Sequence, residues 1–564
     1  MIKNQLKKNL KRALEKIGIK DIELNIEIPG NLDFGDYSSS VALKLTKEFK
    51  NNPLNIAQKI KDNLDKDNLI EKVEVLKPGF INFWISKKYL TRQAEKTANG
   101  EFDIPEYHLG DQKKVMVEFA HPNTHKIFHI GHLRNITTGE SIVRILEAVG
   151  NKVIRANYQG DVGLHIAKCL YKLKAQNSNV KSLKTIKEKI EFIGKMYTEG
   201  SQAYETDEKA KEEILETNKK IYEKDPEILG LWEETRIWSL EYFDQIYERV
   251  YTHFDRLYFE SQMAARGVEL VKQAQEKGIL EKSEGAIIFE GKKYGIDTRV
   301  FINSLGFPTY EGKELALAEK ELSDFGELDK NIHCVTPEQT SFFKVTFKVE
   351  ELIDEKKYKN KQYHLIYEWV NLKEGKMASR MGNIIAGDWI LDKAKEKIIE
   401  KFKCEDKIAE ILAVASVKYS FLKNSLKSAI AFDFDESISM EGNSGTYILY
   451  TYVRTQSLIK KSDSSIYRYI GQTINTLNKD ELMLLRIINQ FSEIVYNAAY
   501  NLSPNIVATY LFNLCQKFNI FYQNCPILSA KETEKNFRLL ITKATGEIIK
   551  EGLDLLGIKT VEKM

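Results

Sequence analysis

The chain has 564 residues, of which 43% are hydrophobic and 29% charged, enough for several buried cores at roughly 150 residues per domain. This composition excludes a disordered or fibrous protein. Charged residues interrupt every window in which a membrane span of ~18 apolar residues or a signal peptide would lie. With 84 Lys and Arg against 81 Asp and Glu, the net charge of +3 points to no particular partner. We therefore expect a soluble protein of the cytoplasm.

The five cysteines provide no framework for a metal or a disulfide. No two of them stand at the C-x-x-C spacing that zinc clusters and redox pairs use. Reduced thiols are therefore the expected state of Cys169, Cys334, Cys404, Cys515 and Cys525.

Residues 1–110 have the pattern of a small α+β domain. Apolar residues at helical spacing predict a helix over 1–17 with a basic outer face, and a second helix over about 54–65. The alternating run VEVLKPGFINFWIS is typical of strands. A solvated basic face is common, so this charge alone does not establish a nucleic-acid contact. The aperiodic segment 98–112 is interpreted as a linker.

A βαβ unit begins near Val115. VMVEFA predicts a buried strand, residues 131–149 a helix, and KVIRANYQG a second strand. Such a unit implies a parallel sheet that binds ligands at the carboxyl ends of its strands. We therefore expect the site in the loop after Ala120.

The rest of the chain continues this α/β pattern and then becomes helical. A charged helical insertion is predicted over about 172–262, after which strand signals resume at AIIF, RVFIN, IHCV and HLIYEWV. The α/β domain is thus expected over 111–395, and an all-helical domain over 396–564.

Four of the nine histidines lie close together in the sequence, at His121, His125, His129 and His132. One hypothesis is a metal site. Against it, Pro122 breaks helical geometry, no H-E-x-x-H occurs, and no cysteine is near. No protein-held metal is predicted.

Polyphosphate binding is the second hypothesis for these histidines. His129, Gly131 and His132 fall where a strand gives way to a helix, and a helix N-terminus presents free N–H groups and a positive dipole to an anion. Gly131 allows close approach of a nucleotide, and the imidazoles can donate hydrogen bonds to phosphate oxygens. Neither a P-loop nor a G-x-G-x-x-G after a strand occurs. A second basic loop, GKMASRMGN, occupies 375–383.

These two motifs resemble the HIGH and KMSKS signatures of class I aminoacyl-tRNA synthetases, and their surroundings resemble the arginyl-tRNA synthetase family. The resemblance extends over essentially the whole chain. Further motifs similar to those of the family follow in its order: GDYSSSVALKL, KPGFINFWIS, VEFAHPNTHKIFHIGHLRN, NYQGDVGLH, FPTYEGKELALA, HCVTPEQTSFF and CPIL…LDLLGIKTVEKM.

The resemblance implies ATP-dependent activation of L-arginine to arginyl-adenylate, followed by transfer to the 3′ end of tRNA(Arg). It implies a class I Rossmann-like parallel-sheet catalytic domain over 111–395, an N-terminal tRNA-elbow-binding domain over 1–110, and a helical anticodon-binding domain over 396–564. ATP would come with Mg²⁺ as a substrate complex, and the family suggests a monomer.

The resemblance also assigns residues to the ATP end of the site. His129 and His132 would stabilise the phosphates while the arginine carboxylate attacks the α-phosphorus, and Lys376 and Arg380 would approach the pyrophosphate. The remaining residues of the implied ATP-binding set are Gly131, Asp161 and Met377.

One position departs from the class I pattern at this end. Ser379 stands where KMSKS has its second lysine. Lys126 matches a lysine that the arginyl family places before HIGH, and it can supply the missing positive charge. The alternative for Lys126 is an ordinary exposed loop lysine.

A guanidinium is planar and carries five donors, so an arginine site calls for carboxylates that accept forked hydrogen bonds. Glu118 and Glu314 match the family positions that do this, and Tyr310 can contact the guanidinium by its hydroxyl or its ring. Asn123 and Gln339 would hold the α-amino and carboxylate end, with the neighbouring Glu338 as an alternative to Gln339.

Two further departures concern this amino-acid site. Glu314 stands where the family usually has Asp, and His121 replaces a small hydroxyl residue. Two alternatives remain beside an arginyl enzyme: a catalytically inactive tRNA-binding paralogue, and a class I synthetase for another amino acid.

Overall fold

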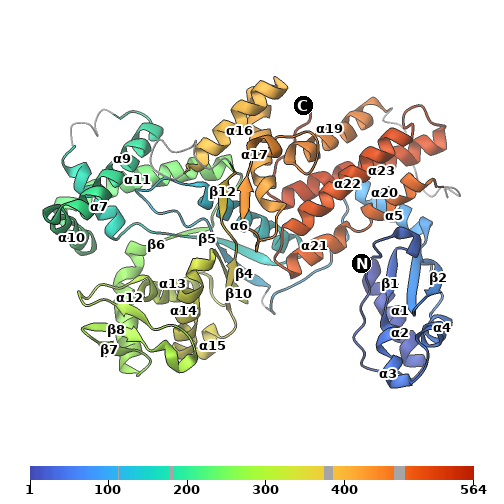
Figure 1. Cartoon of the computed structure of the whole chain (residues 1–564), viewed down its shortest axis with the longest axis horizontal. Helices are drawn as coiled ribbons and strands as arrows, with labels where there is room; N and C mark the ends of the chain where they lie inside the picture. Colours follow the sequence, from blue (N-terminus) through green and yellow to red (C-terminus); the bar gives the residue numbers. More distant parts are fainter. Residues whose placement is uncertain (112, 177–182, 374–384, 463–476) are drawn as a thin grey trace.

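The computed structural model describes residues 1–564 except 112, 177–182, 374–384 and 463–476 (Figure 1). A parallel sheet lies at the centre of the molecule, helices flank it on both sides, and residues from the start of the chain form a lobe at one end. The expected α/β class with a parallel-sheet core is confirmed. None of the described helices is long and apolar enough to cross a membrane.

The central sheet has five strands, and each neighbouring pair is parallel. Its strands in spatial order are β11 (Gln362–Ile366), β10 (Lys330–Val335), β4 (Lys114–Glu118), β5 (Lys152–Gln159) and β6 (Arg256–Phe259). Val115, Met116 and Val117 are fully buried, because helices cover both faces of such a sheet. The order reverses at β4, which lies between the later β10 and the next strand, β5. Ligands of open α/β sheets bind at such a switch point.

The helix α6 (Ile130–Ala148) follows β4 and lies against the sheet, close to the predicted range 131–149. It is buried along most of its length because the C-terminal helices pack on its other side. A side chain at Gly139 would place its Cβ 2.2 Å from the ring of Phe119, so glycine permits this close approach to the residue after β4. The loop that carries the candidate site therefore rests directly on α6.

The predicted insertion is helical, but it ends earlier than expected. Its helices, together with the one that leads into it, are α7 (Leu164–Lys174), α9 (Ile186–Thr206), α10 (Glu208–Glu223) and α11 (Pro226–Arg249). Strand β6 falls within the range 172–262 that was predicted to be helical. Its four residues are too few to show a period of two.

A smaller module follows the insertion and builds a second hydrophobic core. AIIF and RVFIN do form strands, but in an antiparallel sheet of their own rather than beside the central strands. The elements of the module are α12 (Glu260–Glu276), β7 (Glu281–Ser283), β8 (Ala286–Phe289), η2 (Gly291–Tyr294), β9 (Arg299–Ile302), α13 (Tyr310–Phe325), η3 (Pro337–Gln339), α14 (Thr340–Ile353) and α15 (Glu355–Tyr358).

The C-terminal part is mostly helical, with one short exception. Strand β13 (Ile430–Phe432) pairs in parallel with β12 (Val370–Leu372), so the expectation of helix throughout 396–564 was wrong at these three residues. A strand this short leaves no periodic signal. The helices are α16 (Gly387–Phe402), α17 (Asp406–Leu422), α18 (Phe434–Ser437), α19 (Gly445–Lys461), α20 (Lys479–Ile488), α21 (Phe491–Tyr500), α22 (Asn505–Asn524) and α23 (Glu532–Leu555).

The N-terminal lobe matches the predicted helices and strands and docks on the C-terminal helices. Its elements are α1 (Ile2–Lys16), η1 (Leu32–Phe34), β1 (Tyr37–Ser39), α2 (Val41–Lys44), α3 (Thr46–Phe49), α4 (Pro53–Asp62), β2 (Ile70–Leu76), β3 (Phe80–Ile85) and α5 (Lys87–Ala98). Asp36 forms a largely buried ion pair of 2.6 Å with Arg486. Phe102, in the predicted linker, packs edge-on against Phe491 at 5.2 Å between ring centroids. The linker is therefore anchored to α21.

Lys418 of α17 connects three segments where the α/β part of the chain meets the C-terminal helices. Its side chain is fully buried, and its ammonium donates hydrogen bonds to the carbonyls of Val250 at 2.7 Å and Gly557 at 2.6 Å. Burial lowers the pKa of Lys418 to about 7. The two carbonyls satisfy an ammonium that has no access to water.

Candidate functional site

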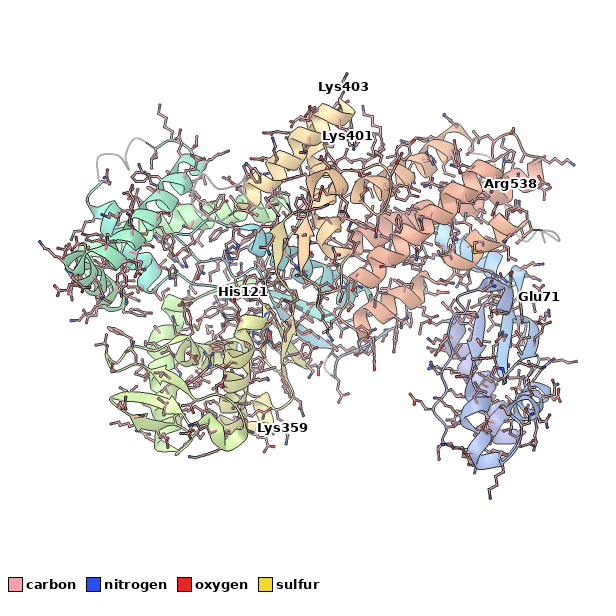
Figure 2. All side chains as sticks on the ribbon, in the orientation of Figure 1. Glu71, His121, Lys359, Lys401, Lys403 and Arg538 are labelled. Carbon is pink, nitrogen blue, oxygen red and sulfur yellow. The ribbon has the colours of Figure 1, made fainter. Side chains whose placement is uncertain are left out.

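The loop between β4 and α6 contains three non-glycine residues in the left-handed region: Ala120, His121 and His125. Buried polar side chains hold each of them by the backbone N–H. Ala120 donates to Asn135 at 2.7 Å, and His121 and His125 donate to residues of β5 and α11. Strained residues of this kind cluster at functional sites, where the surrounding structure compensates their cost. Figure 2 labels His121 near the middle of the molecule.

His129 is the N-cap of α6 and forms a reciprocal pair with His132. The Nδ1 of His129 accepts the N–H of Gly131 at 3.1 Å, and the Nδ1 of His132 accepts the N–H of His129 at 3.1 Å. The two rings stack with centroids 3.7 Å apart. Because each Nδ1 is an acceptor, the neutral rings carry their protons on Nε2. Both imidazoles therefore present one N–H donor each.

The electrostatic surroundings keep these two rings neutral. Burial, and then the charge of Lys126, lowers the pKa of His129 to about 4. Burial and the neighbouring His129 hold the pKa of His132 well below its ordinary value. Near pH 7 the start of α6 therefore offers two neutral imidazole N–H donors, the positive end of the helix dipole and one nearby ammonium. This set of groups suits a polyphosphate.

The four histidines close in sequence do not act together. His125 is fully buried in a network with α11, where its Nε2 lies 2.7 Å from the hydroxyl of Thr235. His121 turns toward β5, with its Nδ1 3.3 Å from the carbonyl of Tyr158. Lys126 lies with its ammonium 5.4 Å from the ring centroid of Tyr197 in the insertion. Across the described ranges, no group of three or more His, Cys, Asp or Glu is arranged to hold a metal ion.

The second basic loop meets the site through its C-terminal flank. Residues 375–383, with the predicted Lys376, Met377, Ser379 and Arg380, lie outside the described residues. The chain after them is hydrogen-bonded to the start of α6. Ile130 donates to the carbonyl of Ile385 at 2.9 Å, and Gly387 donates to the carbonyl of Phe128 at 2.7 Å. The start of α6 and the segment that follows the second basic loop therefore lie side by side.

Asp161 is buried, and both of its carboxylate oxygens are engaged by the protein. Oδ1 accepts the backbone N–H of Ser261 at 2.8 Å, while Oδ2 accepts the Ser261 hydroxyl at 2.7 Å and the Arg236 guanidinium at 2.8 Å. The segment after β5 is thereby joined to α11 and α12. A direct contact of this carboxylate with ATP stays a prediction.

A cluster of four buried glutamates lies at the carboxyl end of β4 and beneath α13 and α14. Its members, which we call the acidic cluster, are Glu118, Glu314, Glu321 and Glu350, each at most 4% exposed. The sequence identified Glu118 and Glu314. It missed the other two, although Glu321 follows Glu314 by two helical turns and so shares its face.

His333 of β10 pairs with Glu118 inside this cluster. Its Nδ1 lies 3.0 Å from Oε1 of Glu118. Burial alone would raise the pKa of Glu118, but the charge and hydrogen bond of His333 outweigh it and keep that pKa below its ordinary value. Burial would also lower the pKa of His333, yet Glu118 raises it to about 9.

The other members of the acidic cluster hold their protons more tightly than free glutamates. Burial, and then the negative charge of Glu118, raises the pKa of Glu314 and of Glu321 well above the ordinary value. Burial raises the pKa of Glu350 to about 8. Glu118, paired with His333, is therefore the member of the cluster that loses its proton most readily.

The remaining predicted amino-acid ligands are Tyr310, Asn123 and Gln339. Tyr310 begins α13, is 58% exposed, and has the Lys313 ammonium 4.6 Å from its ring centroid. Asn123 approaches Gly160 so closely that a Cβ there would lie 2.1 Å from its Oδ1. Gln339 is exposed at the end of η3. A helix start whose groups suit an anion and a buried acidic cluster whose charge suits a cation therefore flank the end of β4.

Comparison with known proteins gives a consistent result along the whole chain. Residues 101–434 match the family described as tRNA synthetases class I (R), catalytic domain. Residues 4–85 match the arginyl tRNA synthetase N terminal domain, and residues 448–564 match the DALR anticodon binding domain.

Individual relatives give the same result. An arginine–tRNA ligase of Fusobacterium nucleatum is 31% identical over 558 residues, covering 97% of this chain and 96% of its own length. One from Borreliella afzelii is 32% identical and covers all of both chains. The solved arginyl-tRNA synthetase of Thermus thermophilus shares the fold over 100% of both chains, with a TM-score of 0.84 at 23% identity.

Proposed function

The chain belongs to the family of class I arginyl-tRNA synthetases and is an arginine–tRNA ligase, and from this premise we propose a role for each residue of its site. The reaction joins a carboxylate oxygen of L-arginine to the α-phosphorus of ATP and breaks the bond to pyrophosphate. The arginyl group then passes to the 3′ end of tRNA(Arg).

We assign the phosphates of ATP to the start of α6. His129 and His132 would donate their Nε2 protons to phosphate oxygens whose charge rises as the α-phosphorus is attacked. Gly131 would let the nucleotide approach the helix start. The neutral state of both rings supports donation without proton transfer.

Lys126 would supply a cation beside the leaving pyrophosphate, where Ser379 leaves the second loop one charge short. Lys376, Met377 and Arg380 would reach the same end from that loop. The hydrogen bonds between its C-terminal flank and the start of α6 support this assignment. Mg²⁺ would enter with the phosphates as part of the substrate.

The guanidinium of arginine would lie against the acidic cluster. Glu118 offers an ionised carboxylate, Glu314 a second carboxyl group from the facing helix, and Tyr310 a ring and a hydroxyl. Asn123 and Gln339 would hold the α-amino and carboxylate end, which must point toward the α-phosphorus. Asp161 would belong to the ATP-binding set, and its bonds to Ser261 would also hold the segment that carries Gly160 against Asn123.

We extend the proposal to the other parts of the chain. Residues 1–110 would contact the elbow of tRNA(Arg), residues 396–564 would bind its anticodon, and residues 111–395, with the helical insertion of about 172–262, would carry out the chemistry. We further propose that the protein works as a monomer in the cytoplasm.

The observation that carries the residue assignments is the pairing of a helix start with two neutral imidazole donors and an ionised buried carboxylate at the end of β4. The test is ATP–pyrophosphate exchange with each of the twenty amino acids, with and without total tRNA that includes the cognate species. Exchange with arginine alone is expected. Exchange with another amino acid would contradict the arginine site, and binding of tRNA without any exchange would favour an inactive paralogue.

A further inference from the structure

We propose that His333 is a positioning residue of the arginine site, an internal imidazolium that orients the carboxylate of Glu118 and keeps it charged for the guanidinium. This inference rests on the proposed role of Glu118 and extends it to a residue that would not touch the substrate. It also explains how a buried carboxylate can stay ionised among three other carboxyl groups.

The position of His333 follows from the sheet. Strands β4 and β10 are neighbours at the point where the strand order reverses, and Glu118 and His333 stand opposite each other in register. Their side chains lie 3.0 Å apart and are 3% and 1% exposed. The pair thus lies where an open α/β sheet binds its ligand, on rigid elements rather than on a loop.

Both ring nitrogens of His333 face acceptors. Nδ1 meets the carboxylate of Glu118, and Nε2 lies 2.9 Å from Oε1 of Gln362. The amide of Gln362 is oriented by its own Nε2, which donates to Oε2 of Glu350 at 2.9 Å. A ring that donates from both nitrogens is an imidazolium.

The aromatic neighbours hold the ring of His333 in this orientation. Phe343 and Phe347 of α14 pack against it with centroids 5.0 and 5.3 Å away. Such packing excludes water, which strengthens the attraction between the ring and Glu118. One carboxylate oxygen of Glu118 is therefore fixed on His333.

The second oxygen of Glu118, Oε2, remains for the ligand. In the described part of the chain it is buried and receives no hydrogen bond from an N–H group or hydroxyl. The hydrogen bond between the carboxyl groups of Glu321 and Glu118 lowers the pKa of Glu118 and raises that of Glu321. The guanidinium of arginine is always protonated, and one of its N–H groups would donate to Oε2 of Glu118.

Several titratable groups face the pair from the surrounding elements. They come from the loop after β4, from β5, from α13, from α14 and from β11, and they are His121, Tyr158, Glu314, Glu321, Glu350 and His364. The positive charge of His333 lowers the pKa of Glu118, Glu314 and Glu350 alike. Without it, burial and mutual repulsion would raise all three pKa values.

The test replaces the cation but keeps a donor, in the variant His333→Gln. With Glu118 protonated in the free protein, arginine must displace a proton to bind, so KM for arginine rises about tenfold for each unit by which the Glu118 pKa exceeds the assay pH. We expect KM for ATP, and kcat at saturating arginine, to change much less. Raising the pH from about 6.5 to 9 should shrink the defect.

The matched control is His364→Gln. His364 stands beside His333 in register on β11 and also packs against Phe343, at 4.8 Å, but its Nε2 meets the carbonyl of Val335 instead of a carboxylate. Its KM for arginine should follow that of the unaltered protein at every pH. The readout is the ratio of variant to unaltered KM, because Glu350, with a pKa of about 8, titrates in the unaltered enzyme.

If the ratio of KM for arginine between His333→Gln and the unaltered protein stays near one, the inference is overturned. A raised ratio that is the same at all pH values would also overturn it. Nitrogen NMR of the unaltered protein with labelled histidine is an independent test, should His333→Gln fail to fold. His333 should keep both ring protons up to about pH 8, since its pKa is about 9, and a neutral ring there would refute the proposal.

A third variant, Glu118→Gln, separates the two proposals. If Glu118→Gln weakens arginine binding while His333→Gln does not, the proposed arginine site is supported and the proposed role of His333 is wrong. If Glu118→Gln leaves KM for arginine unchanged, the proposed arginine site itself is wrong, and the role of His333 falls with it.

Discussion

The two ends of the candidate site use buried histidines in opposite charge states. At the start of α6, His129 and His132 accept hydrogen bonds from backbone N–H groups, and their pKa values lie far below the ordinary one. At the end of β4, His333 meets a carboxylate and an amide oxygen, and its pKa rises to about 9.

Burial acts in the same direction on all three rings, because it disfavours the imidazolium. The hydrogen-bond partner therefore decides the outcome. A backbone N–H on Nδ1 blocks the second proton, whereas a carboxylate retains it. In the proposed assignments the same residue type would thus serve as a neutral donor toward ATP and as a fixed cation behind the carboxylate that binds arginine.

The variants with the largest expected effect replace the imidazole donors at the proposed ATP end and preserve the helix start. Asn at position 129 can still cap α6, and Gln at position 132 can still accept the N–H of the N-cap residue. We expect His129→Asn and His132→Gln each to lower the rate of ATP–pyrophosphate exchange by ~10²–10³-fold, because the amide that replaces each ring does not hold an N–H group at the position of the imidazole Nε2.

The control for this test is His253→Ala, since His253 is exposed and lies outside the site. Its exchange rate should match that of the unaltered protein. Exchange within a few-fold of normal in both His129→Asn and His132→Gln would mean that the paired rings serve only as caps.

The next variant tests the partner of His333 at the proposed arginine end of the site. Glu118→Gln should raise KM for arginine roughly 10- to 100-fold, because a charge-assisted hydrogen bond is lost. It should also lower the pKa of His333, because the carboxylate that retains its second proton is gone. Steady-state kinetics and histidine NMR measure the two effects. A His333 that stays protonated without Glu118 would show that another group holds its second proton.

The smallest expected effect concerns stability at acid pH. The pKa of His129 is about 4 in the folded protein against about 6.5 in the unfolded chain, so between these values the unfolded chain binds more protons. The contribution of His129 to stability is therefore present above pH ~6.5 and is lost as the pH falls, by at most about 1.4 kcal/mol per unit.

His129→Asn should remove this dependence. Thermal unfolding followed between about pH 4.5 and 7 should show a shallower loss of stability in the variant than in the unaltered protein. Parallel curves would show that His129 titrates normally in the folded state.

Much of this site could be predicted from the sequence because its signals are local. The strand VMVEFA, the helix after it and the HIGH residues between them are short-range patterns, and the resemblance to the family identified Glu118 within them. His333 could not be found in this way. Its role depends on which strand lies beside β4 and in which register, and a single sequence states neither.

Other differences have the same origin. His125 belongs to the same local cluster as His129, but its partners come from α11, more than a hundred residues away in the sequence. Asp161 is engaged by side chains of α11 and α12 for the same reason. Strands β6 and β13 were missed because three or four residues carry too little periodicity.

The burial of Lys418 has a practical consequence for handling the protein. Its ammonium depends on the carbonyl of Gly557, and the Ser141 hydroxyl donates to the carbonyl of Leu555. Truncating the chain before these residues would remove one of the two acceptors of the buried Lys418 ammonium. It would also remove the carbonyl that accepts the buried Ser141 hydroxyl. An affinity tag should therefore be fused after residue 564 through a spacer, or at the N-terminus, so that the carbonyls of Leu555 and Gly557 keep these hydrogen bonds.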